Sequence, residues 1–230
     1  MIAAIISDVH GNADALATVL AQARILRCER LLVLGDLVGY YHQPREVMKL
    51  LHEWDFSLVQ GNHDAMLARA AHDASFLLET TNKYGSGLAI ALETLDSSDL
   101  ELLIKAPSRR LESMGEFEVL LCHGSPRDRD EYVYPDAPGE VLDACSGEGD
   151  IVLMGHTHHP FVAVRNGVLL VNAGSVGQAR DRGGVASWST INTANGAVVP
   201  HRTAYDVTPV KRRAAEIDPG NAYLVRVLER

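Results

Sequence analysis

The chain has 230 residues, 47% of them hydrophobic, and a formal net charge of -9 at pH 7. These values are typical of a globular protein with a substantial core. The acidic balance argues against a nonspecific nucleic-acid surface, which requires clustered Lys and Arg. The longest apolar runs are far shorter than the roughly 20 residues that span a bilayer, so no membrane segment is expected.

The first residues, MIAAIISDVHG, have no basic leader and no small-residue cleavage site. They predict a first strand rather than a signal peptide, and we therefore expect a cytoplasmic protein. The three cysteines, Cys28, Cys122 and Cys145, lack C-x-x-C spacing. This number and spacing argue against a disulfide framework and against a thiolate zinc site.

Apolar runs alternate with amphipathic stretches in the first part of the chain. Strands are predicted at 3–7, 31–35 and 56–61, and helices at 13–25 and 44–54. This alternation is typical of an α/β fold with parallel strands. Residues 64–106 are predicted to be mainly helical, with a helix cap at 97–99.

The second half has a different pattern, because short strand candidates follow one another with few helices between them. They lie at 118–124, 150–156, 167–175, 187–193 and 197–206, and they predict a second sheet packed on the first. A helix is expected at 210–217. Residues 125–140 form a long polar loop and are a candidate lid over a site.

Polar side chains follow five of the predicted strands. They lie at the carboxyl ends of these strands, which form the edge at which open α/β sheets bind ligands. They are Asp8, His10, Asp36, Asn62, His63, Asp64, His123, His156 and His158. Asp, Asn and His suit transition metals, whereas calcium prefers oxygen alone and structural zinc prefers thiolates. In an extended stretch Asp8 and His10 point to the same side, as do His156 and His158.

Taken singly, Asp8 and Asp36 are more often turn or cap residues than metal ligands. The histidines, taken singly, are more often satisfied core residues. The set as a whole favours metal binding, because buried carboxylates and imidazoles without a shared cation are costly. Seven ligands are too many for one ion and suit two ions that share a carboxylate.

The ordered motifs D-x-H, G-D, G-N-H-D, C-H-G and G-H-T-H resemble those of the calcineurin-like metallophosphoesterase superfamily, over roughly residues 3–206. The segments SDVHGN, GDLVGY, GNHD, HGSP and SVGQ are similar to a small bacterial and archaeal phosphodiesterase branch, which includes diadenosine tetraphosphate hydrolases. The resemblance implies a four-layer αββα sandwich of two mixed β-sheets flanked by helices. It implies one domain over 1–230, with 207–230 as a C-terminal extension.

The resemblance also implies two divalent metal ions, with Mn expected and Fe, Zn, Ni, Co or Mg as alternatives. One ion would be held by Asp8, His10, Asp36 and His158. The other would be held by Asp36, Asn62, His123 and His156, so that Asp36 bridges the two. The implied reaction is hydrolysis of a phosphodiester or phosphoanhydride by a hydroxide shared between the ions.

Further roles follow from the same resemblance. His63 would protonate the leaving oxygen, and Asp64 would orient and charge the His63 imidazole. Asn12, Ser175, Gln178 and Arg180 would lie around the metals. Among them Asn12, Ser175 and Arg180 would bind the substrate, with Arg180 suited to a two-pronged phosphate contact. The expected substrate is a small phosphorylated molecule, with nucleotides and dinucleoside polyphosphates among the candidates.

Two alternatives stay open. One is a broad-specificity phosphomonoesterase. The other is a non-catalytic protein-binding scaffold of the same fold, like the retromer scaffold subunit, whose lineage lacks the histidine of the GNHD segment that is intact here. The tail 207–230 is predicted to contain a helix and an edge strand able to pair with a second subunit, so a homo-oligomer is also a candidate.

Overall fold

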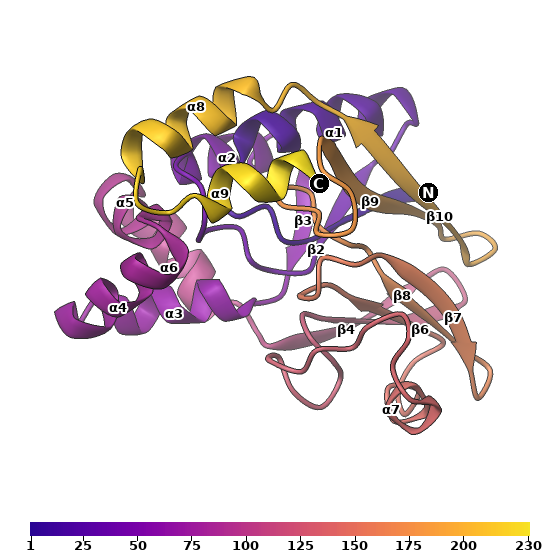
Figure 1. The fold of residues 1–230 in the computed structure, drawn as a ribbon. Helices are drawn as coiled ribbons and strands as arrows, with labels where there is room; N and C mark the ends of the chain where they lie inside the picture. Colours follow the sequence, from indigo (N-terminus) through magenta and orange to yellow (C-terminus); the bar gives the residue numbers. More distant parts are fainter.

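The computed structural model describes residues 1–230 and shows two five-stranded β-sheets packed face to face (Figure 1). In the first sheet β1, β2 and β3 are parallel, and β9 and β10 continue it antiparallel beyond β1. Its spatial order is β10 (Ala197–Ala204), β9 (Val185–Asn192), β1 (Ile2–Ile6), β2 (Arg30–Val33), β3 (Asp55–Leu58).

The second sheet has three parallel strands, β5, β6 and β8, with an antiparallel strand at each edge. Its order is β4 (Arg109–Met114), β5 (Phe117–Cys122), β6 (Ile151–Met154), β8 (Val168–Asn172), β7 (Phe161–Arg165). The prediction of two mixed sheets flanked by helices is confirmed. The sequence analysis did not predict the two edge strands. The strand β4 exposes polar side chains and lacks an apolar run, whereas β7 contains the short apolar run FVAV, which the predicted strands left out.

Six helices lie between β1 and β4: one between β1 and β2, one between β2 and β3, and four between β3 and β4. They are α1 (Ala13–Ile25), α2 (Pro44–Leu51), α3 (Asn62–Ala70), α4 (Ala74–Tyr84), α5 (Gly87–Thr94) and α6 (Ser97–Lys105). Pro44 opens α2, where its missing N–H costs nothing. The cap of α6 is Asp96, one residue before the predicted cap, and its side chain accepts a hydrogen bond from the Asp99 backbone N–H.

The core has three apolar layers. Ile5, Leu32, Leu121 and Leu153 belong to the layer between the two sheets. A larger layer lies between the first sheet and its helices. The outer face of the second sheet is covered by the short helix α7 (Gly139–Asp143) and the loop before it. The fourth layer of the predicted αββα sandwich is therefore thin. None of the helices is both long and apolar enough to cross a bilayer.

The C-terminal tail contains α8 (Thr208–Ile217), α9 (Tyr223–Arg226) and a 3-10 turn, η1 (Val227–Glu229). The predicted edge strand in this tail is wrong, because its apolar residues pack as helical turns. Leu224 and Val227 lie in a cluster with Tyr40 and Tyr41. The Tyr41 hydroxyl donates a 3.1 Å hydrogen bond to the Leu224 carbonyl. The tail therefore buries its apolar side chains against its own chain, next to a loop that follows β2.

Candidate metal centre

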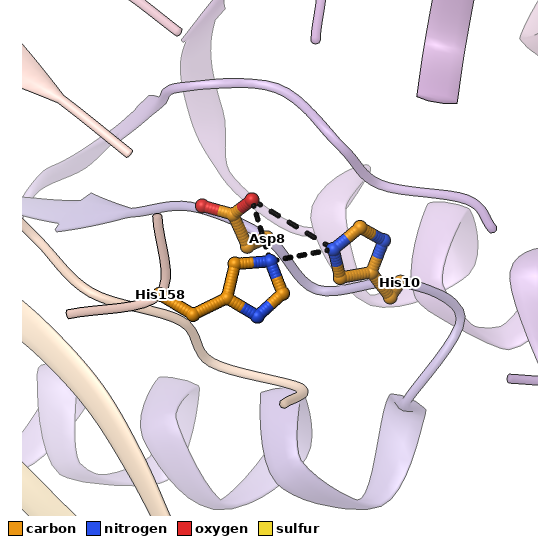
Figure 2. A group of neighbouring side chains, drawn as sticks. All are labelled: Asp8, His10 and His158. Carbon is orange, nitrogen blue, oxygen red and sulfur yellow. Dashed lines mark hydrogen bonds and ion pairs between the residues drawn. The ribbon is translucent and has the colours of Figure 1, made fainter. Parts of the chain in front are cut away.

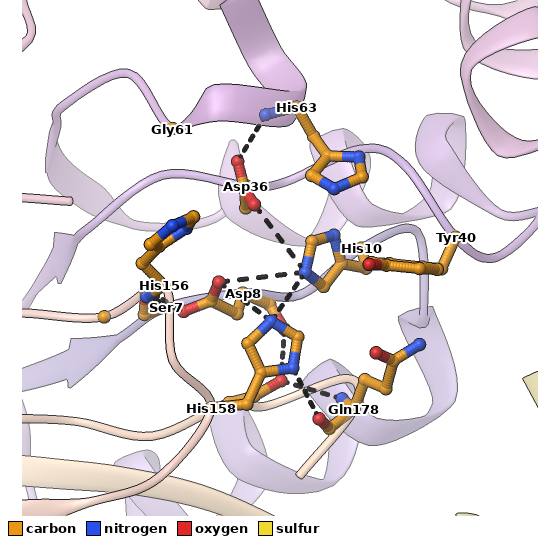
Figure 3. A network of polar contacts seen from close by, with 12 residues as sticks. Ser7, Asp8, His10, Asp36, Tyr40, Gly61, His63, His156, His158 and Gln178 are labelled. Atoms are coloured by element: carbon orange, nitrogen blue, oxygen red, sulfur yellow. Dashed lines mark hydrogen bonds and ion pairs between the residues drawn. The ribbon is translucent and has the colours of Figure 1, made fainter. Parts of the chain in front are cut away.

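Seven polar side chains meet where β1, β2, β3, β5 and β6 end at their carboxyl ends. They are Asp8, His10, Asp36, Asn62, His123, His156 and His158, the seven ligands implied by the motifs. All except Asn62 are at most 5% exposed. The parallel course of β1–β3 and of β5–β6 brings these ends together at one edge of the two sheets. Figure 3 shows the side chains of Asp8, His10 and His158 close together at this edge.

The backbone at these strand ends has an unusual conformation. Only seven non-glycine residues of the chain have positive φ, and five of them are predicted ligands: Asp8, His10, Asp36, His156 and His158, with φ between 51° and 65°. Such backbone is uncommon outside glycine and concentrates at functional sites. The prediction that Asp8 and His10, and likewise His156 and His158, lie in extended chain is therefore wrong. The side chains converge because the chain turns at each ligand.

Asp8, His10 and His158 form a first group, whose ligand atoms lie within 4.8 Å of one another (Figure 2). His10 Nδ1 lies 3.1 Å from the Val38 carbonyl, and His158 Nδ1 lies 2.6 Å from the Gln178 carbonyl. Because a carbonyl only accepts, each Nδ1 carries the proton, and each Nε2 lone pair faces inward. The two Nε2 atoms are 3.1 Å apart, which requires a cation or a proton between them.

Asp36, His123 and His156 form a second group of the same size. His123 Nδ1 donates to the Leu34 carbonyl at 2.6 Å, and its Nε2 lies 3.1 Å from the Asn62 Oδ1. His123 Nε2 is also 3.4 Å from Asp36 Oδ2. His156 Nε2 is buried and has no hydrogen-bond partner. Carbonyl acceptors behind metal-binding imidazoles are the usual second layer of such sites.

Two carboxylates connect these groups. Asp36 Oδ2 lies 3.7 Å from His10 Nε2 in the first group and 3.4 Å from His123 Nε2 in the second. Asp8 Oδ1 lies 3.2 Å from His158 Nε2 and 3.9 Å from His123 Nε2. Asp8 therefore occupies a more central place than its assignment to one ion implied.

The residues present fit divalent metal ions. Asp8 Oδ1 is fully buried without a hydrogen-bond partner, although Ser7 Oγ and the His156 backbone N–H both donate to its Oδ2. An ionised oxygen of this kind is costly to bury unless a cation contacts it. The donors are imidazole nitrogens, carboxylate oxygens and one amide, a set that suits Mn, Fe, Zn, Co or Ni.

The imidazoles of the second group have opposite pKa shifts. Burial alone lowers the pKa of His123, but the Asp36 and Asp8 carboxylates outweigh it and raise the pKa to about 10. Burial and then the neighbouring charge of His123 lower the pKa of His156 to about 4. The protein thus attracts one positive charge to the carboxylates and keeps His156 neutral, as a metal ligand must be.

The structure corrects the role predicted for Asp64. Its carboxylate does not contact His63 but accepts backbone N–H groups from Asp36 at 2.7 Å, Leu37 at 3.0 Å and Gly61 at 3.0 Å. Burial, followed by the Asp36 carboxylate, raises the pKa of Asp64 to about 7. Asp64 supplies the carboxylate half of a capping box at the start of α3, where the N-cap residue is Gly61, and it fixes the turn that carries Asp36. Its position three residues after Gly61 is the sequence signal for this role.

His63 borders the metal cluster. Its backbone N–H donates to Asp36 Oδ1 at 2.8 Å, which places the N-terminus of α3 against this carboxylate. A ring nitrogen of His63 lies within 4.8 Å of the ligand atoms of His10 and Asp36, and its Nδ1 is buried without a partner. The ring packs at 4.9 Å between centroids against Tyr40 and against Tyr84.

Two residues predicted to contact substrate are instead used by the fold. The fully buried Asn12 caps α1 by accepting from the Ala15 N–H, and its amide donates to the Gly177 carbonyl and to the Tyr205 hydroxyl. Ser175 Oγ donates to the Asp8 carbonyl and accepts from the Gln178 N–H. These bonds hold the turns that carry the candidate metal ligands, and they occupy both side chains.

Arg180 differs, because it keeps free hydrogen-bonding capacity beside the site. One of its terminal nitrogens donates to the Tyr40 hydroxyl at 3.3 Å, whereas its buried Nε has no partner. Tyr40 also packs edge-on against His10 at 4.7 Å between centroids (Figure 3). Tyr40 was not among the predicted site residues. Its sequence signal is its place at the end of the segment GDLVGY, four residues after Asp36 in the loop that follows β2.

Comparison with known proteins agrees with this geometry. A model of the calcineurin-like phosphoesterase superfamily domain matches residues 1–195. The uncharacterized protein MJ0912 of Methanocaldococcus jannaschii is 30% identical over an alignment of 226 positions, which covers 89% of this chain and 88% of the archaeal protein.

Two solved structures share the fold over nearly the whole chain. The hypothetical protein PH1004 from Pyrococcus horikoshii OT3 has a TM-score of 0.88 at 22% identity, with 99% of this chain and 97% of that chain covered. A metallophosphoesterase from Sphaerobacter thermophilus has a TM-score of 0.80 at 28% identity, with 100% and 98% covered. On the family match and the buried Asp and His cluster together, the chain belongs to the calcineurin-like phosphoesterase superfamily.

Proposed function

We propose that this protein is a two-metal phosphoesterase that hydrolyses phosphodiester or phosphoanhydride bonds, with dinucleoside polyphosphates among its candidate substrates. One observation carries the proposal. The Nε2 atoms of His10, His123 and His158 all face Asp8 Oδ1, a buried oxygen without a hydrogen-bond partner, and each Nδ1 is committed to a backbone carbonyl. Such a cluster is prearranged for cations.

Each ion has its own set of residues in this proposal. Asp8, His10, Asp36 and His158 would hold one, and Asp36, Asn62, His123 and His156 would hold the other. Mn is our expected metal. When bound, two such ions activate water for in-line attack on phosphorus and neutralise the phosphoryl oxygens. The cations outweigh the two aspartates, so the site attracts phosphate although the chain is acidic.

Two further residues would act on the substrate. His63 lies at the border of the cluster with an unpartnered ring nitrogen, and we assign it to protonate the leaving oxygen. Arg180 has an unpartnered Nε and lies beside Tyr40, so its guanidinium is free to bind a phosphoryl oxygen that points away from the ions. Asn12 and Ser175 have no substrate contact in this proposal, because their side chains are hydrogen-bonded within the fold.

The first test measures metal content and turnover on the same protein. Purified protein reconstituted with Mn²⁺ should bind two ions per chain by elemental analysis and hydrolyse bis(p-nitrophenyl) phosphate. Asp36→Asn should reduce both, because Asp36 lies between the two groups. Asp99→Asn is the matched control, since Asp99 is a buried carboxylate on α6 whose side chain contacts His52 instead.

The outcomes separate the candidate functions. Two bound ions without turnover of any phosphoester would favour the non-catalytic scaffold. Turnover of monoesters at rates equal to those of diesters and polyphosphates would favour the broad phosphomonoesterase. Stoichiometric binding of a single ion would refute the two-metal proposal.

The second test concerns His63. His63→Asn should lower kcat by about 10²–10⁴-fold for substrates with a poor leaving group, the range expected for a general acid. The loss should be much smaller with p-nitrophenyl esters, whose leaving group needs no proton. The metal content should stay unchanged. An equal loss on both substrates would show that His63 has another role.

A further inference from the structure

Two tyrosines stand out on the loop between β5 and α7. Tyr132 is 52% exposed and Tyr134 is 38% exposed, and they are the exposed large aromatic side chains of the molecule. All other Phe, Trp and Tyr residues are at least partly buried. Because aromatic side chains contribute most when buried, two exposed ones on neighbouring positions indicate a surface for a partner molecule.

The loop holds both rings in a fixed arrangement. Val133, between them, is fully buried in the apolar cluster outside the second sheet. Successive residues of an extended chain point to opposite sides, so Tyr132 and Tyr134 point away from the side on which Val133 is buried. Their rings lie only 15° from parallel, with centroids 6.0 Å apart. The anchored valine thus presents two nearly parallel aromatic rings together.

This pair lies directly beside the metal centre. The Tyr132 ring centroid is 4.1 Å from that of His156, a residue of the second metal group. The Tyr134 ring packs edge-on against His159, next to the ligand His158, at 5.4 Å between centroids. A short linker such as a ribose would therefore be long enough to join a planar group stacked on these tyrosines to a phosphate at the candidate metal ligands.

We propose that Tyr132 and Tyr134 form a stacking surface for a nucleobase, so that the substrates of this enzyme are nucleoside phosphoesters or phosphoanhydrides. The inference rests on the proposed function and narrows its substrate class. Aromatic side chains stack on any base, so the surface selects for the presence of a base rather than for its identity. The loop predicted as a lid thus contributes to substrate selection.

The test uses two ligands that share ribose and phosphate and differ by the base. Adenosine 5′-monophosphate and ribose 5-phosphate are titrated into the Mn²⁺-loaded protein by isothermal calorimetry. The protein should bind the nucleotide about 5- to 100-fold more tightly, the range expected for stacking of one base. The same pair of ligands is titrated at short times with product analysis, which checks that turnover does not affect the result.

Variants identify the residues responsible. Tyr132→Leu and Tyr134→Leu should remove most of this preference while leaving the affinity for ribose 5-phosphate unchanged. Tyr132→Phe and Tyr134→Phe should retain it, because stacking needs the ring and not the hydroxyl. Equal binding of both ligands by the unaltered protein, or a preference that survives in the double Leu variant, would overturn the inference.

Metal content separates a stacking role from a positioning role. If Tyr132→Leu lost metal or weakened both ligands equally, Tyr132 would act by holding His156, and the inference would be wrong. Tyr134 makes no such contact with His156 and serves as the internal control. Failure of the proposed function gives a different result, since the protein would then hydrolyse no phosphoester whatever its ligand preference.

Discussion

The Asp64 carboxylate gives the sharpest quantitative prediction. It accepts three backbone N–H groups, from Asp36, Leu37 and Gly61, and is fully buried. Asp64→Ala leaves these three donors without a partner. Each orphaned buried donor costs about 1–3 kcal/mol, so the three lost bonds cost about 3–9 kcal/mol. The raised pKa of Asp64 offsets part of this cost at neutral pH, and the free energy of unfolding should fall by about 3 kcal/mol or more. For a chain of this size, that corresponds to a decrease in Tm of at least about 6 °C.

Urea unfolding of the metal-free protein measures this loss without a contribution from metal binding. Asp99→Ala is the control, because its carboxylate is buried but contacts one side chain, the half-exposed His52, at 2.6 Å. This variant should lose about 1 kcal/mol. The Asp64 variant should also bind metal more weakly, since Asp36 loses its support. If Asp64→Ala were no more destabilising than Asp99→Ala, the reasoning from the three N–H bonds would be refuted.

Three further predictions concern the metal centre and the C-terminal tail. Mn²⁺ at about 100 times its Kd should stabilise the protein by about 2.7 kcal/mol, and this is measured as a rise in Tm. Asp8→Asn should abolish most of that rise, because the substitution removes the buried negative charge that faces the candidate metal ligands. Burial alone raises the pKa of Asp218, but hydrogen bonds from His42 and Ser86 outweigh this effect and lower the pKa. The ionised Asp218 carboxylate therefore stabilises the fold above about pH 4, the unfolded pKa, and this stabilisation is lost as the pH falls through the folded pKa. The urea midpoint of Asp218→Asn should accordingly lie below that of the unaltered protein at pH 6 and converge with it toward pH 3, whereas a constant difference would contradict the assignment. Leu224→Ala should cost about 2–5 kcal/mol in urea unfolding because Leu224 is fully buried in the tail cluster, and a loss below about 1 kcal/mol would show that the tail packs loosely.

The predicted strands and the ligand set came from local patterns. Apolar runs such as those before Asp8 and Asp36 predict buried strands, and the polar residue types that follow them predict metal binding. The edge strand β4 was missed because an edge strand has no requirement for an apolar run, whereas the run FVAV of β7 was a usable local signal. The tail was misread in part because short apolar segments fit a strand and a buried helical turn equally well.

The partners of each side chain could not be predicted in the same way. Asp64 lies next to His63 in sequence, yet its carboxylate binds the backbone of Asp36 and Leu37, 27 or 28 residues away. Asn12 follows a ligand motif, yet its amide bonds the Gly177 carbonyl. These contacts depend on how the turns pack, and turn packing is a property of segments distant in the chain.

The sequence by itself determined the layered α/β architecture and the chemical types of the metal-binding groups, because strand periodicity and residue identity are local. Tertiary structure alone decided that the turns at Asp8, Asp36 and His156 adopt positive φ and that Tyr132 lies on His156. The physical reason is that backbone strain and ring contacts at this site are stabilised only when β1, β2 and β6 are held together by the core between the two sheets.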